Sequence, residues 1–378
     1  MGGCVRFLRK WYYDIDHFTL FFALGLAALG LLMSFSVSPA MSYRIHVGTY
    51  HFSIRHVFFC IVGISIMLLV SMFSRISILN MSYAGLFVCI CLLGVVLLTS
   101  GNIKGSKRWI SLGFFAVQPT ELLKPFFIIM NAHFLSLKNK TKIASFISVG
   151  MLGTIGILLL LQPDFGNTIL YSSIWFVQVF LGSVGVGILI ASLFIGVISL
   201  ASIGFFMFPH FHYRIVNFLQ LKAGHEQYQT KKSIESIHNG GFFGTGLGEG
   251  DVKYQLPDAH TDYIFATICE EWGAILAFTM LLAYLYFTYR HLASNFTNSK
   301  YEIRVIYGLV LMIVAQSCVH IGVNINLLPS KGITLPLVSY GGSSMLANSL
   351  IFGFLLAFTR KTYAFRSNYS DFEIVKRG

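Results

Sequence analysis

The sequence predicts an all-α, polytopic integral membrane protein with about ten transmembrane helices and one long outer loop between helices 7 and 8. Of its 378 residues, 55% are hydrophobic and 11% are charged, and its mean hydropathy is +0.71. Apolar windows of about 20 residues, the length that crosses the hydrocarbon of a bilayer, recur along the chain. Because lipid offers no partner to backbone polar groups, each window is expected to be a helix.

The expected spans together make a single transmembrane domain over residues 1–378. They are placed at residues 18–38, 52–73, 79–99, 120–137, 143–161, 166–181, 184–208, 262–289, 305–323 and 341–358. The window at 166–181 is short, so nine and ten spans both remain open. Polar tails, residues 1–17 and 360–378, flank the spans.

Basic residues set the expected orientation. Lysine and arginine gather in both tails and in alternate connections, whereas the short loops on the other side hold only Arg44, Lys104, Lys107, Arg108 and Lys331. The positive-inside rule therefore places both termini in the cytoplasm and residue 262 at the outer face. The formal net charge of +12 does not indicate nucleic acid, because the basic residues form no run that could follow a phosphate backbone.

The only long connection, residues 209–261, lies on the outer side. A structureless loop of that length is uncommon, so we expect it to be functional and partly ordered. Its part at 228–238 mixes charged residues with Ile234 and Ile237, which predicts an amphipathic helix on the membrane surface. Residues 240–250 follow and are rich in glycine, which favours sharp turns and close backbone approach.

One stretch, residues 256–273, begins as a polar loop and becomes apolar after Asp262. Two more carboxylates, Glu270 and Glu271, lie inside its apolar part. A carboxylate in a membrane costs free energy unless it faces a cavity or a partner, so all three are candidate functional residues. If the eighth helix begins near Asp262, the positive end of the helix dipole would keep that carboxylate ionised and able to accept a proton.

Two interpretations of Asp262 stay open: a proton acceptor, or an ordinary acidic residue at a helix start. Its neighbours favour the first. His260 and Lys253 are close in sequence, and Lys331 is another outer cation. One base among several cations at the outer face fits a reaction on an anionic, lipid-linked substrate.

The fourth span opens with a second polar group, Gln118, Glu121 and Lys124. Glu121 and Lys124 are three residues apart and share a helix face, so they form either a structural ion pair or the lining of a cavity. Arg108, just before this span, has a planar fork that suits oxyanions. Asp164 is expected to cap a helix or turn, with cavity lining as the alternative.

Six sequence blocks in order carry a family resemblance. They are residues 105–110, 118–124, 162–166, 240–250, 256–273 and 328–344. With these blocks the chain resembles the SEDS family (shape, elongation, division and sporulation proteins, which includes FtsW, RodA and SpoVE) from about residue 101 to 353. The segment at 248–262, Gly-Glu-Gly-Asp-Val-Lys-Tyr-Gln-Leu-Pro-Asp-Ala-His-Thr-Asp, resembles the FtsW branch more than the RodA branch.

The resemblance implies a glycosyltransferase that polymerises lipid II into peptidoglycan during cell division, with undecaprenyl pyrophosphate as leaving group. It implies that Asp262 is the essential carboxylate and acts as general base. Cations expected to bind the substrate are Arg108, Lys331, Lys253 and Lys124, with His260 beside them. The residues expected to line the cavity are Gln118, Glu121, Asp164, Glu270, Glu271 and Ser343.

The family's partners, by resemblance, are a class B penicillin-binding protein (a transpeptidase), other division proteins and membrane lipid, in the bacterial inner membrane. A divalent cation, Mg²⁺ or Mn²⁺, is compatible with a diphosphate leaving group, but no ligand set is evident. Three alternatives remain: a lipid II flippase, a scaffold without catalysis, and a RodA-like role in elongation.

Overall fold

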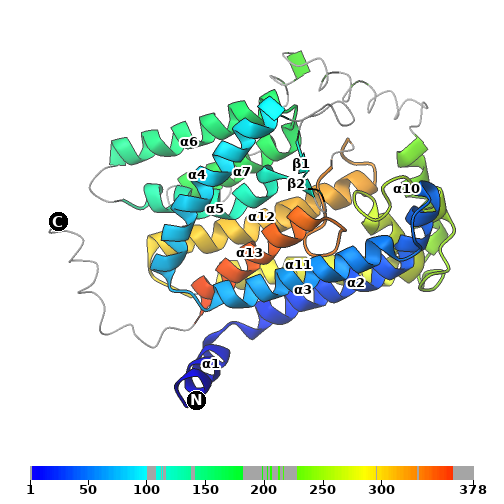
Figure 1. The fold of residues 1–378 in the computed structure, drawn as a ribbon, viewed down its shortest axis with the longest axis horizontal. Helices are drawn as coiled ribbons and strands as arrows, with labels where there is room; N and C mark the ends of the chain where they lie inside the picture. The colour runs from blue at the N-terminus through cyan, green and yellow to red at the C-terminus, as the bar shows by residue number, and fades with distance from the viewer. Residues whose placement is uncertain are drawn as a thin grey trace.

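The computed structural model describes residues 2–99, 108–111, 113, 116–137, 141–181, 228–294, 296–329 and 332–360, with isolated positions between 198 and 216. This part of the chain is a bundle of long helices (Figure 1). The helices are α1 (Gly2–Asp14), α2 (His17–Ile45), α3 (His51–Ser71), α4 (Arg75–Thr99), α5 (Pro119–Leu135), α6 (Thr141–Leu161), α7 (Phe165–Phe180), α10 (Tyr228–Gly240), α11 (Ile264–Ala293), α12 (Lys300–Asn324) and α13 (Gly342–Thr359), with a 3₁₀ turn η1 (Val252–Tyr254).

The predicted helical class is confirmed, and each predicted span except the seventh corresponds to a helix. The seventh, 184–208, lies almost entirely outside the described residues. Among the described residues, seven helices are long and apolar enough to cross a membrane: α2, α3, α4, α6, α11, α12 and α13. Helices α5 and α7 are shorter, with 17 and 16 residues. Helix α5 is buried along almost its whole length, so its polar residues are enclosed by protein.

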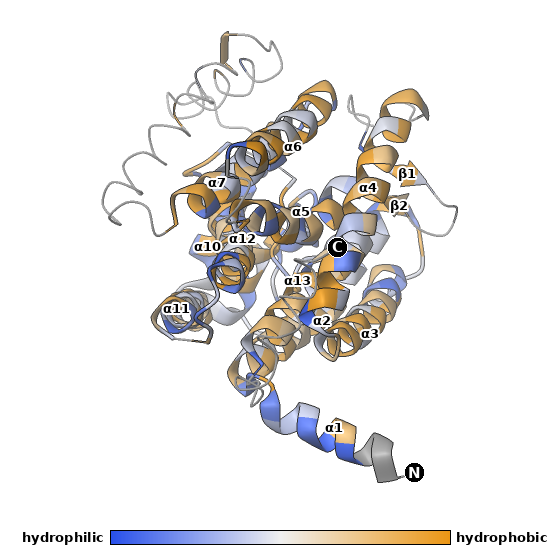
Figure 2. Ribbon diagram, turned by 90° about the vertical axis from the view of Figure 1, so that its left-hand side faces the viewer, coloured by the Kyte–Doolittle hydropathy of each residue, from blue (hydrophilic) through white to orange (hydrophobic). Residues whose placement is uncertain are grey.

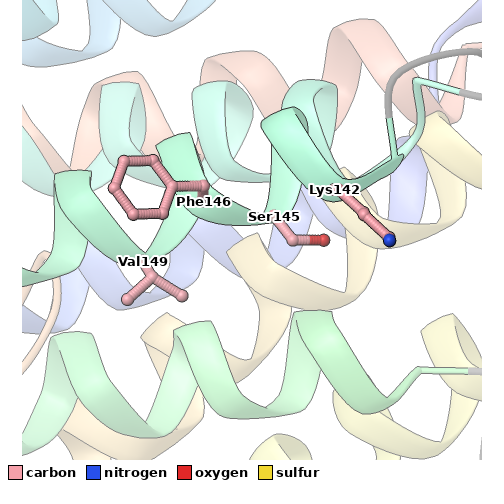
Figure 3. A pocket seen from close by; sticks show the side chains of 4 residues that line it. All are labelled: Lys142, Ser145, Phe146 and Val149. Carbon is pink, nitrogen blue, oxygen red and sulfur yellow. The ribbon is translucent and has the colours of Figure 1, made fainter.

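Most residues of the long helices are hydrophobic, as the hydropathy colours of Figure 2 show, and many of them lie on the outside of the bundle. Large side chains such as Phe87, Leu98 and Phe146 are mostly exposed. A soluble protein rarely exposes so much apolar area, so this surface is the one that faces lipid. Figure 3 shows a depression on α6, lined by Lys142, Ser145, Phe146 and Val149, on the same side of the helix as the exposed Phe146.

Ion pairs tie the helices together at the end of the bundle where the chain begins. Asp16 caps α2 and accepts hydrogen bonds of 2.5 Å from both terminal nitrogens of Arg290 at the end of α11. Arg75, at the start of α4, pairs with Glu302 in the first turn of α12. In Figure 1, α1 and the N-terminus lie at this end and α10 at the opposite end.

Three details differ from the sequence prediction. The segment expected as an N-terminal tail, 1–17, contains helix α1. The strands β1 (Ile110–Ser111) and β2 (Ala116–Val117) form a short antiparallel ribbon, although an all-α protein was expected. Helix α11 begins at Ile264 rather than at Asp262, because the turn before it is closed by the carbonyl of Asp258.

The helix predicted at 228–238 is confirmed as α10, but it packs on protein. Its buried positions, Thr230, Ser233, Ser236 and Gly240, are small and recur every three or four residues along one face. The hydroxyl of Ser236 donates to the carbonyl oxygen of Ala266 in α11, at 3.1 Å. A face of small residues lets the backbones of α10 and α11 approach closely.

Helix α11 is broken at Gly273, which has φ 71° and ψ −176°. The glycine-rich loop at 240–250 occupies the break. The N–H of Ala274 donates to Gly241 O at 2.9 Å, and the N–H groups of Thr245 and Gly246 donate to the carbonyls of Glu270 and Glu271 at 2.9 and 3.0 Å. The close backbone approach predicted for the glycine-rich loop is confirmed, because a Cβ on Gly273 would lie 2.3 Å from Phe242 O.

The substitution Gly273→Ala is expected to destabilise the protein by about 2 kcal/mol or more, because it adds overpacking to a backbone conformation that only glycine adopts easily. The measurement is the thermal unfolding midpoint of the detergent-purified protein. Gly25→Ala, in α2 with no atom within 4 Å of the added Cβ, is the control and should change stability by less than about 1 kcal/mol. Equal midpoints for the two variants would contradict this account of the break.

Candidate functional site

The predicted site residues that the structure describes lie in turns or in the helices next to them, and several of these turns meet at the end of the bundle opposite α1. The turn before α11 contacts the turn before α13, since the N–H of Tyr340 donates to His260 O at 2.9 Å and Ser339 Oγ donates to Thr261 O at 2.9 Å. The turn before α5 also contacts α13, through Gln118 and Ser343. Segments far apart in sequence therefore converge around the start of α11.

Asp262 lies in a tight turn directly before α11. The carbonyl of Asp258, a residue with φ 54°, accepts the N–H groups of Thr261 and Asp262, both at 3.0 Å. The carboxylate is half-buried and lies beside the segment that follows Lys331, because a Cβ on Gly332 would be 3.7 Å from its Oδ2. Lys331 itself lies outside the described residues.

His260, in the same turn as Asp262, packs against two aromatic rings that also contact each other. Its ring centroid is 4.7 Å from that of Phe52 in α3 and 5.2 Å from that of Tyr340. On the other side of Asp262, burial, with the charge of Asp262 as a second cause, raises the pKa of Tyr263 to about 12. Both causes favour the protonated form of the Tyr263 phenol.

Lys253 is fully buried and neutralised within the protein. Its ammonium donates to Glu271 Oε1 at 2.6 Å, to Gly248 O at 2.7 Å and to Ser36 Oγ at 3.0 Å. Ser36 in turn donates to the same carboxylate. All three ammonium hydrogens are thus engaged, so the predicted contact of Lys253 with substrate would require this pair to open.

Glu270 binds the outer loop in a similar way. Its carboxylate accepts the N–H of Val252 at 2.8 Å and the hydroxyl of Ser236 at 2.9 Å. Glu270 and Glu271 therefore hold α10, η1 and the glycine-rich loop against α11. The prediction that the two residues line a cavity stays a prediction.

Glu121 and Lys124 form the ion pair that their spacing predicts, with Lys124 Nζ donating to Glu121 Oε1 at 2.6 Å. Both side chains are buried in the bundle. At the start of the same helix, the N–H of Gln118 donates to Ser343 Oγ at 3.0 Å, which joins α5 to α13. Gln118, Glu121 and Lys124 therefore lie at the start of α5, and Ser343 lies in the neighbouring helix α13. Their predicted role in lining a cavity stays a prediction.

Arg108 contacts the turn before α7. Its Nε donates to Gln162 O at 3.2 Å, another nitrogen donates to Pro163 O, and Nη1 lies 3.8 Å from Asp164 Oδ1. Asp164 is the N-cap of α7, as the capping interpretation predicted, and accepts the N–H of Asn167 at 3.4 Å. Backbone carbonyls therefore hold the guanidinium beside the turn before α7.

Two further observations concern groups that the sequence did not assign. In the described ranges, no group of three or more His, Cys, Asp or Glu side chains could hold a metal ion, so the divalent cation stays a prediction. Sequence reasoning also missed Asn324, which donates to the backbone carbonyl of Asp262 at 3.0 Å. The one available signal was a polar amide in the last turn of an apolar span.

A match to a protein family identifies the family to which the chain belongs. Residues 16–364 match the FtsW, RodA and SpoVE family, described as cell cycle proteins. The chain belongs to this family. Every turn described above lies within the matched range, and the predicted resemblance is confirmed.

Named relatives extend over nearly the whole chain. This chain is 33% identical over 360 residues to the probable peptidoglycan glycosyltransferase FtsW of Caulobacter vibrioides, and the match covers 94% of this chain and 91% of the relative. It is 34% identical over 363 residues to the probable peptidoglycan glycosyltransferase FtsW of Francisella salina, with 91% and 88% covered.

Solved structures share the fold of this chain. A chain of a peptidoglycan synthase complex superimposes with a TM-score of 0.72 at 23% identity, over 93% of this chain and 99% of that one. The rod shape determining protein RodA of Thermus thermophilus gives a TM-score of 0.66 at 24% identity, over 92% and 98%. The arrangement of helices is therefore the one found in these structures. The apolar helices and the family match together make this chain an integral protein of the inner membrane.

Removing the buried cation with Lys253→Met is expected to destabilise the protein by about 3–5 kcal/mol, because the carboxylate of Glu271 is left buried without its countercharge. The double variant Lys253→Met/Glu271→Gln should recover part of the loss. Unfolding midpoints of purified variants measure the effect. The control, Lys232→Met, removes a more exposed pair with Glu235 and should cost less than about 1 kcal/mol. A Lys253→Met variant no less stable than this control would contradict the assignment.

Proposed function

We propose that this chain is a peptidoglycan glycosyltransferase that polymerises lipid II into glycan strands, with Asp262 as general base. The family match and relatives named as probable peptidoglycan glycosyltransferases support the activity. The observation that carries the mechanism is the place of Asp262, a half-buried carboxylate directly before the N-terminus of α11. That helix end favours the ionised form, which is the form that accepts a proton.

The proposed reaction is a displacement with inversion at one carbon. Asp262 takes the proton of the 4-hydroxyl of the acceptor's GlcNAc as that oxygen forms a bond to the anomeric carbon of the donor's MurNAc. The bond from that carbon to the diphosphate breaks, and its electron pair leaves with undecaprenyl pyrophosphate. General-base assistance of this kind is worth about 10²–10⁴-fold in rate.

The departing diphosphate needs cations, and the described residues differ in how well they suit that task. Arg108 is held by two backbone carbonyls at the outer end, and a guanidinium has five N–H donors, so it suits phosphate oxygens. Lys124 and Lys253 are each paired with a buried carboxylate at 2.6 Å, whereas the ion pair of Arg108 with Asp164 is longer, at 3.8 Å. We therefore assign the diphosphate first to Arg108 and Lys331, with His260 next to Asp262 in the substrate-facing turn.

The setting of this activity is proposed from the family and from one solved neighbour. Relatives named FtsW favour a role in division over one in elongation. A neighbour taken from a peptidoglycan synthase complex supports a class B penicillin-binding protein as partner, alongside other division proteins. The distribution of basic residues supports cytoplasmic termini and an outward-facing Asp262.

Asp262→Asn is expected to lower strand formation by at least about 100-fold, because an amide cannot take the acceptor's proton. The assay supplies purified protein and its cognate transpeptidase with lipid II and resolves glycan strands on a gel. Asp251→Asn, which changes an exposed carboxylate in the same outer loop, is the control and should polymerise normally.

The same assay separates the alternatives. Normal strand synthesis by Asp262→Asn would overturn the proposed mechanism. A scaffold would still assemble with the transpeptidase and make no strands even as wild type. A flippase would move lipid II between leaflets, would be insensitive to Asp262→Asn and would respond to charge changes at Glu121 and Lys124, which form a buried pair.

Orientation is tested by cysteine labelling in a variant without native cysteines. Tyr254→Cys, in the outer loop, should react with a membrane-impermeant maleimide in intact cells, whereas Tyr12→Cys, in α1, should react only after the membrane is opened. Exposure is matched, since the two tyrosines are 46% and 48% exposed. The reverse pattern would overturn the proposed orientation.

A further inference from the structure

We propose that Asn324 is the positioning residue of Asp262: its side-chain amide fixes where helix α11 begins and thereby where the carboxylate stands. The inference rests on the proposed function, because Asp262 is the base in that reaction. Asn324 is the last residue of α12 and is completely buried. It touches the backbone of the turn, so it acts through Asp262 and needs no contact with substrate.

The amide of Asn324 uses both of its polar atoms. Its Nδ2 donates to the carbonyl oxygen of Asp262 at 3.0 Å and to that of His320, one turn earlier in its own helix, at 2.8 Å. Its Oδ1 accepts the N–H of Ala266 at 3.0 Å. One side chain thus binds the turn on one side and the first turn of α11 on the other.

The contact with Ala266 is a helix cap supplied from another helix. The first N–H groups of a helix have no partner within it, and a capping side chain usually comes from the N-cap residue. Tyr263, at the N-cap of α11, makes no side-chain cap hydrogen bond among the described residues. Asn324 takes that role from α12, so the first turn of α11 is fixed relative to α12.

A third helix is joined to the same residue. Ser233 Oγ in α10 donates to the backbone carbonyl of Asn324 at 2.7 Å. Helices α10, α11 and α12 therefore meet at Asn324, directly behind the turn that carries Asp262. A general base must lie within hydrogen-bonding distance of the substrate hydroxyl that it deprotonates. A displacement of the base by about 1 Å can cost about 100-fold in rate.

The test compares the same one-atom change at two nearby positions. Asn324→Asp keeps the shape of the side chain but places an acceptor against the carbonyls of Asp262 and His320. Asn326→Asp, in the turn after α12, is the matched control, since aspartate tolerates the φ of 55° found there. Asn324→Ser, which keeps one donor and avoids a new charge, covers the case in which Asn324→Asp does not fold.

Each variant is purified with the transpeptidase, checked for a single folded species by size exclusion, and assayed for kcat and KM with lipid II. We expect kcat per folded molecule to fall about tenfold or more for both Asn324 variants, with KM within about twofold of wild type, and no change for Asn326→Asp. A purely structural role would lower the folded yield and leave kcat per folded molecule unchanged, and this result would overturn the inference.

The outcome for Asp262→Asn in the same assay separates the two proposals. If Asp262→Asn is inactive and the folded Asn324 variants keep the wild-type kcat, the positioning role alone is wrong. If Asp262→Asn polymerises normally, the proposed mechanism itself fails, whatever the Asn324 variants do.

Discussion

The need of every enclosed backbone group for a hydrogen-bond partner shapes the part of this protein around the break in α11. Helix α11 breaks at Gly273, which frees N–H and carbonyl groups in the middle of a membrane-spanning element. The glycine-rich loop satisfies them with its own backbone. Because only glycine lets the two backbones approach this closely, the loop composition and the helix break depend on each other.

The carboxylates of Glu270 and Glu271, in α11, differ from that of Asp262, in the turn before α11, in what surrounds them. Glu270 and Glu271 lie beside the break and bind Val252, Ser236 and Lys253, so their charges hold the outer loop in place. Asp262 precedes α11, in a turn whose backbone is fixed by hydrogen bonds. A carboxylate whose backbone is fixed while its side chain is half-buried is well suited to accept a proton from a bound sugar.

Several features of the site could be predicted from sequence because they are local. The spacing of Glu121 and Lys124 on one helix face is enough to predict their ion pair, and Asp164 before an apolar run is enough to predict a cap. The partners of Lys253 could not be predicted. They come from α2, from the glycine-rich loop and from α11, and closeness in sequence to Asp262 suggested a substrate contact instead.

The sequence by itself determined the helical membrane class and most of the spans, and it singled out Asp262 as the candidate base, because hydropathy windows and ordered motifs are properties of the chain alone. Tertiary structure decided which charges are neutralised inside the protein, why α11 starts after Asp262 and which residue caps it. Those properties depend on contacts between segments far apart in sequence. Asn324 is the clearest case, since nothing near it in the chain indicates that its amide holds the turn of Asp262.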